Sequence, residues 1–131
     1  MYQSLTGMFT RPLSSSLKVL DVKNEDTVII AARSEVRLPI LIENEGLKLK
    51  WSISSNRDIN FKLCFSLPEG EEIHELVPLR RINSHLEAFK GHLVARKCGI
   101  YTIVLDNTYS KLTAKEVTYK LDVTRNINFE A

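Results

Sequence analysis

The strictest alternation of apolar and polar residues lies at positions 116–123 of the 131-residue chain. Its apolar members are Val117, Tyr119, Leu121 and Val123, and its polar members are Glu116, Thr118, Lys120 and Asp122. Because successive side chains of a strand point to opposite faces, this run predicts a strand with one face on a core and the other in water. Similar runs predict further strands at 17–22, 27–32, 35–43, 47–53, 59–67, 85–96 and 99–105.

Turn-forming residues lie between and within these runs. Residues 23–26 predict a turn, and Pro39 predicts that its strand lies at a sheet edge or is bulged, since proline lacks an N–H group. Gly91 predicts a bulge or bend in the run that contains it. Residues 69–84 hold no period, so we expect a long loop there, with at most a short strand around Val77.

About eight short strands and no helical period predict an all-β protein, folded as an antiparallel β-sandwich of the jelly-roll type. A chain of this length suits one domain. We expect that domain at 17–124, preceded by a flexible lead-in at 1–16 and followed by a loose tail at 125–131. Its inward faces would carry five aromatic residues, Trp51, Phe61, Phe65, Tyr101 and Tyr119.

Composition narrows the class of protein. With 44% hydrophobic and 26% charged residues the chain is typical of globular proteins, and a net charge of +2 is too small to indicate nucleic acid by itself. Cys64 and Cys98 predict free thiols in a reducing compartment, with one disulfide as the alternative. No apolar run reaches the ~20 residues of a membrane helix, and the N-terminus lacks a signal-peptide core, so we expect a cytoplasmic protein.

No catalytic or cofactor-binding pattern is present. The sequence lacks the spacings C-x-x-C, H-x-x-x-H and G-x-S-x-G, and its five glycines are scattered singly. We therefore expect no enzyme activity, no metal and no cofactor.

Basic residues are concentrated in one stretch of the sequence. Between 80 and 97, the single acid Glu87 stands among five basic residues, Arg80, Arg81, Lys90, Arg96 and Lys97. If the fold gathers them, they form a patch for an acidic protein or for anionic lipid headgroups; the alternative is a set of charges scattered around a solvated rim. No basic cluster is interleaved with exposed aromatic residues, so nucleic acid is not an expected partner.

Several stretches resemble the GOLD (Golgi dynamics) domain, over about 17–123. The matching stretches are Leu49-Lys50-Trp51, Asn83-Ser84-His85, Gly99-Ile100-Tyr101, Asp106-Asn107-Thr108-Tyr109-Ser110 and Lys115-x-Val117-x-Tyr119. The motif residues among them are Trp51, His85, Gly99, Tyr101, Asp106, Asn107 and Tyr109. The resemblance is closest to the C-terminal GOLD domains of cytosolic CRAL-TRIO lipid carriers and of the FYVE-and-coiled-coil autophagy adaptor. Two departures are Cys98, where this group often has proline, and the turn at 32–35, which lacks the usual glycine.

The resemblance implies a non-catalytic adaptor that mediates protein–protein contacts in vesicle trafficking, Golgi organisation or lipid handling. The partner would bind through 69–84, through the basic residues or by strand addition at a sheet edge. The alternative is direct binding of anionic membrane lipids, such as phosphoinositides, by the same basic residues, supporting lipid transfer or membrane targeting. We expect a monomer, peripheral on Golgi or endosomal membranes, with a dimer through edge strands near Pro39 as a further alternative. Asp106 and Asn107 are expected to be turn formers.

Overall fold

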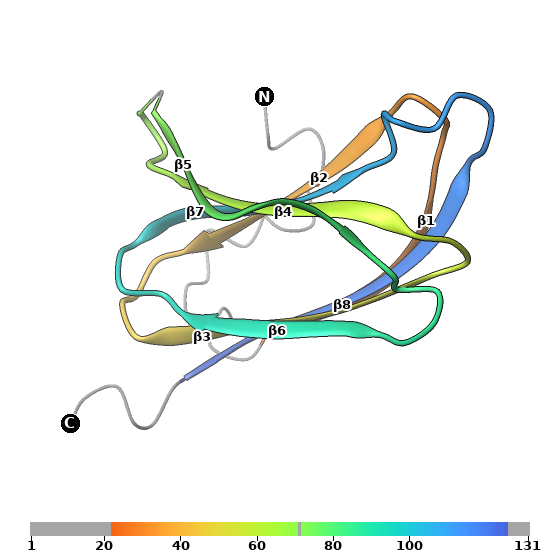
Figure 1. The fold of residues 1–131 in the computed structure, drawn as a ribbon. Helices are drawn as coiled ribbons and strands as arrows, with labels where there is room; N and C mark the ends of the chain where they lie inside the picture. The colour runs from red at the N-terminus through yellow and green to blue at the C-terminus, as the bar shows by residue number, and fades with distance from the viewer. Residues whose placement is uncertain (1–21, 71, 126–131) are drawn as a thin grey trace.

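The computed structural model describes residues 22–70 and 72–125, which form two four-stranded antiparallel sheets (Figure 1). Sheet A has the order β1-β8-β3-β6, and sheet B has the order β2-β7-β4-β5. The strands are β1 (Val22–Ile30), β2 (Glu35–Ile42), β3 (Leu47–Ser55), β4 (Ile59–Ser66), β5 (Ile73–Ile82), β6 (Phe89–Val94), β7 (Gly99–Asp106) and β8 (Lys115–Arg125). The predicted all-β sandwich is confirmed.

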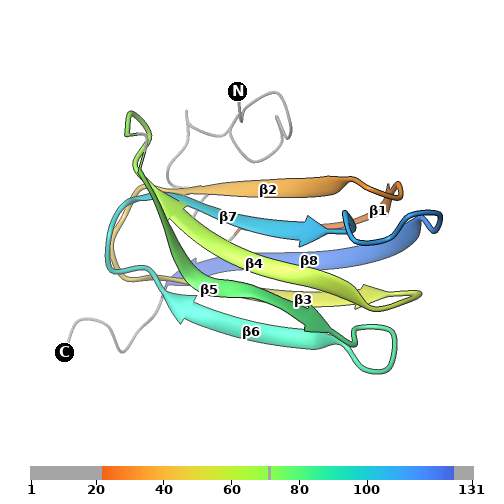
Figure 2. The same cartoon turned by 45° about the horizontal axis from the view of Figure 1, so that its top comes forward.

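The chain changes sheet at every connection except the β4–β5 hairpin. As a result, β1 and β2 are the edge strands along one flank of the sandwich, and β5 and β6 are the edge strands along the other (Figure 2). Pro39 lies in β2, so the prediction that its strand lies at a sheet edge is correct.

The core lies between the sheets and follows the predicted alternation. In β8 the buried apolar positions are Val117, Tyr119, Leu121 and Val123, each less than 3% exposed. The apolar positions of β3 lie beside them in sheet A, and those of β4 face them from sheet B; the ring centres of Trp51 and Phe61 lie 5.6 Å apart across the interior. β7, an inner strand of sheet B, is buried along nearly its whole length.

The predicted turn at 23–26 is wrong. These residues lie inside β1, where they pair with β8 from Asp122 to Tyr119. Pairing with a neighbouring strand therefore overrides their local preference for a turn. Of the predicted strand at 17–22, only Val22 lies within the described residues, and it begins β1. At the other end, β8 continues to Arg125, the first residue of the expected tail.

The predicted long loop at 69–84 is also wrong, because ten of its residues form β5. The pairing of β4 with β5 shifts register twice, between Phe61 and Leu63 and between Leu63 and Cys64. Each shift places an extra residue in β5, so that its side chains change face. Two such irregularities in one strand erase the period of two that would have predicted it.

The predicted strand at 85–96 is shorter, and its predicted bulge is absent. β6 begins at Phe89, and its register with β3 runs without a shift through the pair Gly91–Trp51. A Cβ atom at Gly91 would lie 2.6 Å from Cε2 of Trp51. The glycine is therefore required by the indole ring that covers it, not by a change of strand direction.

Candidate functional site

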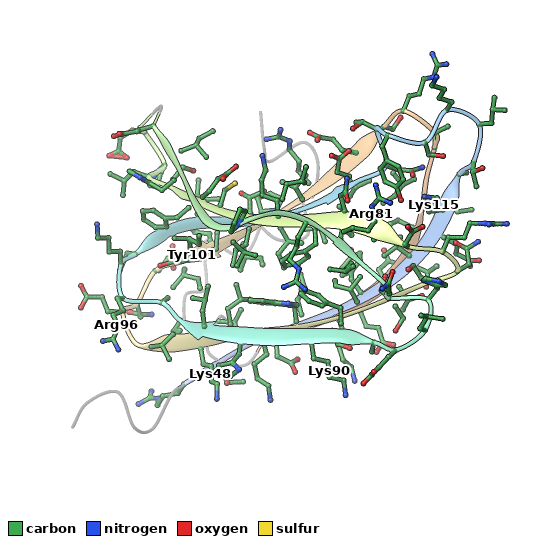
Figure 3. All side chains as sticks on the ribbon, in the orientation of Figure 1. Lys48, Arg81, Lys90, Arg96, Tyr101 and Lys115 are labelled. Atoms are coloured by element: carbon green, nitrogen blue, oxygen red, sulfur yellow. The ribbon has the colours of Figure 1, made fainter. Side chains whose placement is uncertain are left out.

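The five basic residues singled out from the sequence occupy three places in the sandwich. Arg80 and Arg81 are consecutive in β5 and so point to opposite faces of sheet B, while Lys90 lies on β6. Arg96 and Lys97 lie in the β6–β7 connection, at the opposite end of the molecule from Arg81 (Figure 3). The fold brings Arg96 and Lys97 together, but it does not gather all five residues.

Arg81 is held by a polar cluster, which we call the Tyr109 cluster: Asp58, Arg81, Tyr109 and Lys115. The guanidinium donates to Oδ2 of Asp58 at 3.0 Å, and its carbon atom Cζ lies 3.7 Å from the centre of the Tyr109 ring. Its Nε also donates to Oδ1 of Asn60 at 2.8 Å. An arginine with this many partners is a structural element of its surroundings.

Lys115 completes the Tyr109 cluster from the first position of β8, where it is only 3% exposed. Its Nζ donates to the backbone oxygen of Asp58 at 3.1 Å and to Oη of Tyr109 at 2.9 Å. The Tyr109 hydroxyl in turn donates to the same Asp58 oxygen at 2.9 Å. These bonds tie the β7–β8 connection to the start of β4.

Asn107 closes the same end of the sandwich. Its side chain is fully buried, and Nδ2 lies 2.9–3.1 Å from the backbone oxygens of Ile30, Ala31 and Thr113. The adjacent turn carries Arg33 with a positive φ of 66°, a conformation that glycine adopts more readily. Asn107 thus joins the β1–β2 turn to the β7–β8 connection.

An apolar groove of about 590 Å³ runs between the edge strands β5 and β6, and its lining residues Arg96 and Tyr101 lie at the end away from Arg81 and Lys115 (Figure 3). Its lining residues come from five strands and from the β6–β7 connection: Trp51, Phe65, His74, Leu76, Val77, His92, Leu93, Val94, Arg96, Lys97 and Tyr101. The floor is aromatic, because Trp51, Phe65 and Tyr101 are each at least 93% buried. The cationic side chains of Arg96 and Lys97 are exposed beside it.

Two motif residues shape this groove. The Tyr101 hydroxyl donates to the backbone oxygen of Lys97 at 2.7 Å and so holds the β6–β7 connection in place. Burial raises the pKa of this hydroxyl, which keeps it neutral and able to donate. The Tyr101 ring lies 5.0 Å from that of Phe65, and a Cβ atom at Gly99 would lie 2.5 Å from Cε1 of Phe65. Gly99 therefore leaves room for the aromatic floor.

The other end of the same flank is closed. The guanidinium of Arg80 lies 5.3 Å from the ring centre of Phe89, so that a side chain from β5 covers one from β6. Phe89 packs edge-on against Phe61 with ring centres 4.9 Å apart. A cation over an aromatic face is a stabilising contact, and here it joins the two sheets.

The described residues were also compared with the requirements of a disulfide, a metal site and a membrane helix. Cys64 and Cys98 are free thiols, as predicted, and burial raises the pKa of the Cys64 thiol. Within 22–70 and 72–125, no group of three His, Cys, Asp or Glu side chains is placed to hold a metal ion. The same residues include no helix long and apolar enough to cross a membrane.

Comparison with known proteins identifies the fold family. The human FYVE and coiled-coil domain-containing protein 1 is 35% identical over 97 residues, which cover 71% of this chain. The human Golgi resident protein GCP60 is 27% identical over an alignment of 158 positions that spans 91% of this chain. This β-sandwich is a GOLD domain. The alignments cover only 7% and 30% of the two relatives.

Two further comparisons add little to the GOLD assignment. No family model matches the chain. Among solved structures, a mitogen from Yersinia pseudotuberculosis has a TM-score of 0.47 and 20% identity over 80% of this chain and 86% of that chain.

The sequence does not reveal the groove residues of β5, because the register shifts of that strand remove its period of two. One signal was available. In the run Leu76-Val77-Pro78-Leu79, apolar residues surround a proline, a combination that is typical of a bulged edge strand. His74 then falls opposite Phe65 in the pairing with β4, and this places it at the groove.

Proposed function

We propose that this GOLD domain is a non-catalytic adaptor that binds a protein partner in the groove between β5 and β6, within a vesicle-trafficking or Golgi pathway. The groove itself is the observation that supports this function, because it combines a buried aromatic floor with a cationic rim. The setting is supported by one relative whose name places it in the Golgi.

The groove suits an extended peptide segment. β5 and β6 are edge strands, so backbone groups on their outer sides lack a neighbouring strand in the described sandwich. Trp51 Nε1 is buried and has no hydrogen-bond partner among the described residues, so a small shift of the floor would let it donate to a bound carbonyl. A partner segment with one apolar anchor and flanking acidic residues would match the floor and Arg96 and Lys97.

Binding of peptides tests this function directly. A library of extended peptides would be screened against the domain, against Leu76→Asp in the groove and against Leu112→Asp, whose side chain is 91% exposed outside it. We expect selected peptides to share an apolar residue beside acidic ones, and to lose affinity at least tenfold with Leu76→Asp alone. Equal loss with both variants, or none with either, would count against the groove as the binding site.

Lipid binding through the five predicted basic residues has weaker support. Arg81 would have to leave Asp58 and Tyr109, and Arg80 would have to leave Phe89, before either could contact a headgroup. Arg96 and Lys97 lie at the other end of the molecule (Figure 3). The five residues therefore lack the common face that a membrane would contact.

We propose that the domain is a monomer in solution. The alternative dimer would pair two copies of β2, but Pro39 in its centre has no N–H group to offer a neighbouring strand. Light scattering across a concentration series would distinguish the two states, and a mass that doubles with concentration would contradict the monomer.

A further inference from the structure

The outer face of sheet A carries four lysines on three adjacent strands. Lys48 and Lys50 come from β3, Lys90 from β6 and Lys120 from β8. Only Lys90 belongs to the basic set that the sequence indicated. The other three were hidden because they are separated in sequence and become neighbours only through strand pairing.

The strand register places these residues, which we call the lysine face, close together. Ser52 on β3 is paired with Lys90 on one side and with Lys120 on the other. Lys50, two residues earlier, is paired with His92 and Asp122. Since neighbouring strands are about 4.8 Å apart and residues two apart are about 6.7 Å along a strand, the backbones of Lys50, Lys90 and Lys120 lie about 8–10 Å apart, roughly one Debye length at physiological salt. Lys48 lies two residues further along β3. These lysines act on an anion as one charged surface.

This surface is open, and four lysines on it outnumber two nearby carboxylates, Asp122 and the Glu25 that is paired with Lys120. A hollow of about 350 Å³ lies over it, lined by Lys50, Trp51, Ser52, Lys90, Gly91, His92, Lys120 and Asp122. Asp122 is the only carboxylate in that lining. Among the ion pairs of residues 22–70 and 72–125, none involves a lysine of this face. Lys48 and Lys90 point away from sheet B (Figure 3).

We propose that the lysine face docks the domain on an anionic membrane surface. Lysine ammonium groups act as point charges without the paired geometry of arginine, so they attract a layer of negative charge without selecting one ligand shape. A protein interface has an apolar, often aromatic centre, whereas the centre of this face is Ser52 between two lysines. Single-stranded nucleic acid would need exposed aromatic residues for stacking, and the hollow offers none beyond the buried Trp51.

The lysine face and the groove are different surfaces, although Trp51 and His92 line both hollows. The lysine face lies on the outer side of sheet A, whereas the groove opens at the flank between β5 and β6 (Figures 1 and 3). The membrane proposal does not depend on the proposed function, and each has its own variants.

Flotation with lipid vesicles tests the proposal. The domain would be mixed with phosphatidylcholine vesicles, with and without phosphatidylserine and a phosphoinositide, at low and physiological salt. The test variant is Lys50→Gln/Lys90→Gln/Lys120→Gln, and the control, Arg57→Gln/Lys62→Gln/Lys111→Gln, loses three positive charges outside both the lysine face and the groove. Each lysine near an anionic surface contributes about fivefold in affinity, so the test variant should bind on the order of 100-fold more weakly while the control keeps most binding.

A second variant raises affinity where the first lowers it. Asp122→Asn removes the carboxylate from the hollow, and we expect it to strengthen binding to anionic vesicles by about fivefold. Urea denaturation of each variant confirms that it is folded. The proposal is overturned if the wild-type domain does not float with anionic vesicles at low salt, or if the two triple variants lose affinity equally. It is also overturned if soluble poly-glutamate binds with the same lysine dependence while vesicles do not, which would indicate an acidic protein partner.

Discussion

Cationic and aromatic side chains lie at both ends of the β5–β6 flank, but they close the sandwich at one end and line an open groove at the other. At one end, Arg80 covers Phe89 and Arg81 is fixed between Asp58 and Tyr109, so cations and aromatic rings close the sandwich. At the other end, aromatic rings form the floor of an open groove, with Arg96 and Lys97 beside it. The two ends differ in what contacts their cations: Arg80 and Arg81 contact aromatic rings and Asp58, whereas Arg96 and Lys97 lie exposed beside the groove.

This contrast explains why a basic cluster in the sequence is a poor guide to a binding surface. Arg80 and Arg81 are adjacent in sequence, yet each makes a contact within the domain: Arg80 covers the Phe89 ring and Arg81 donates to Asp58. The lysine face draws Lys50, Lys90 and Lys120 from three strands that only the sandwich brings together. Cations close in sequence can thus be structural, while a charged surface is assembled from distant positions.

The largest effect is expected at the closed end, for Asn107→Ala. The substitution leaves the backbone oxygens of Ile30, Ala31 and Thr113 without their buried donor. An unsatisfied buried polar group costs about 1–3 kcal/mol, and several are affected, so we expect a loss of about 3 kcal/mol in the free energy of unfolding. Urea denaturation measures it. Asn83→Ala, at an exposed position, is the control and should change stability little; a loss below about 1 kcal/mol at Asn107 would show that this end does not depend on it.

The next effect lies at the floor of the groove, for Gly91→Ala. The new methyl group would overlap the Trp51 ring and force it to move. Overpacking of this kind costs about 1–3 kcal/mol. Since Trp51 is the single tryptophan, its fluorescence reports the displacement directly, and denaturation reports the cost. Gly70→Ala is the matched control, because its nearest neighbour would be in ordinary contact at 3.4 Å. Unchanged fluorescence in Gly91→Ala would contradict the packing of glycine against indole.

Much of the fold could be predicted from the sequence, for a physical reason. Strands with one wet face and one buried face show their period of two directly, as at 116–123, and these strands make up most of the core. β5 could not be read this way, because its two register shifts move side chains from one face to the other.

The binding surfaces were harder to predict than the core. The groove depends on β5 being a strand, and the lysine face depends on which strands are neighbours, so both follow from pairing rather than from local pattern. The role of Gly91 likewise could not be predicted from the local sequence. A glycine within a strand can signal a bulge or a close neighbour, and only the position of Trp51 decides between them.

The smallest changes in stability are expected for Arg81→Ala at the closed end and Lys97→Ala at the open end, and this pair of variants compares the two ends directly. Arg81 has an ion pair and a ring contact, but its side chain is 45% exposed, so we expect a loss of about 1 kcal/mol that shrinks partly at high salt. Lys97 is exposed at the rim of the groove, and its loss should change stability by less than about 0.5 kcal/mol. Peptide affinity should show the reverse order, because only Lys97 lines the groove. If the variants affected stability and affinity in the same order, the closed and open ends would not be functionally distinct.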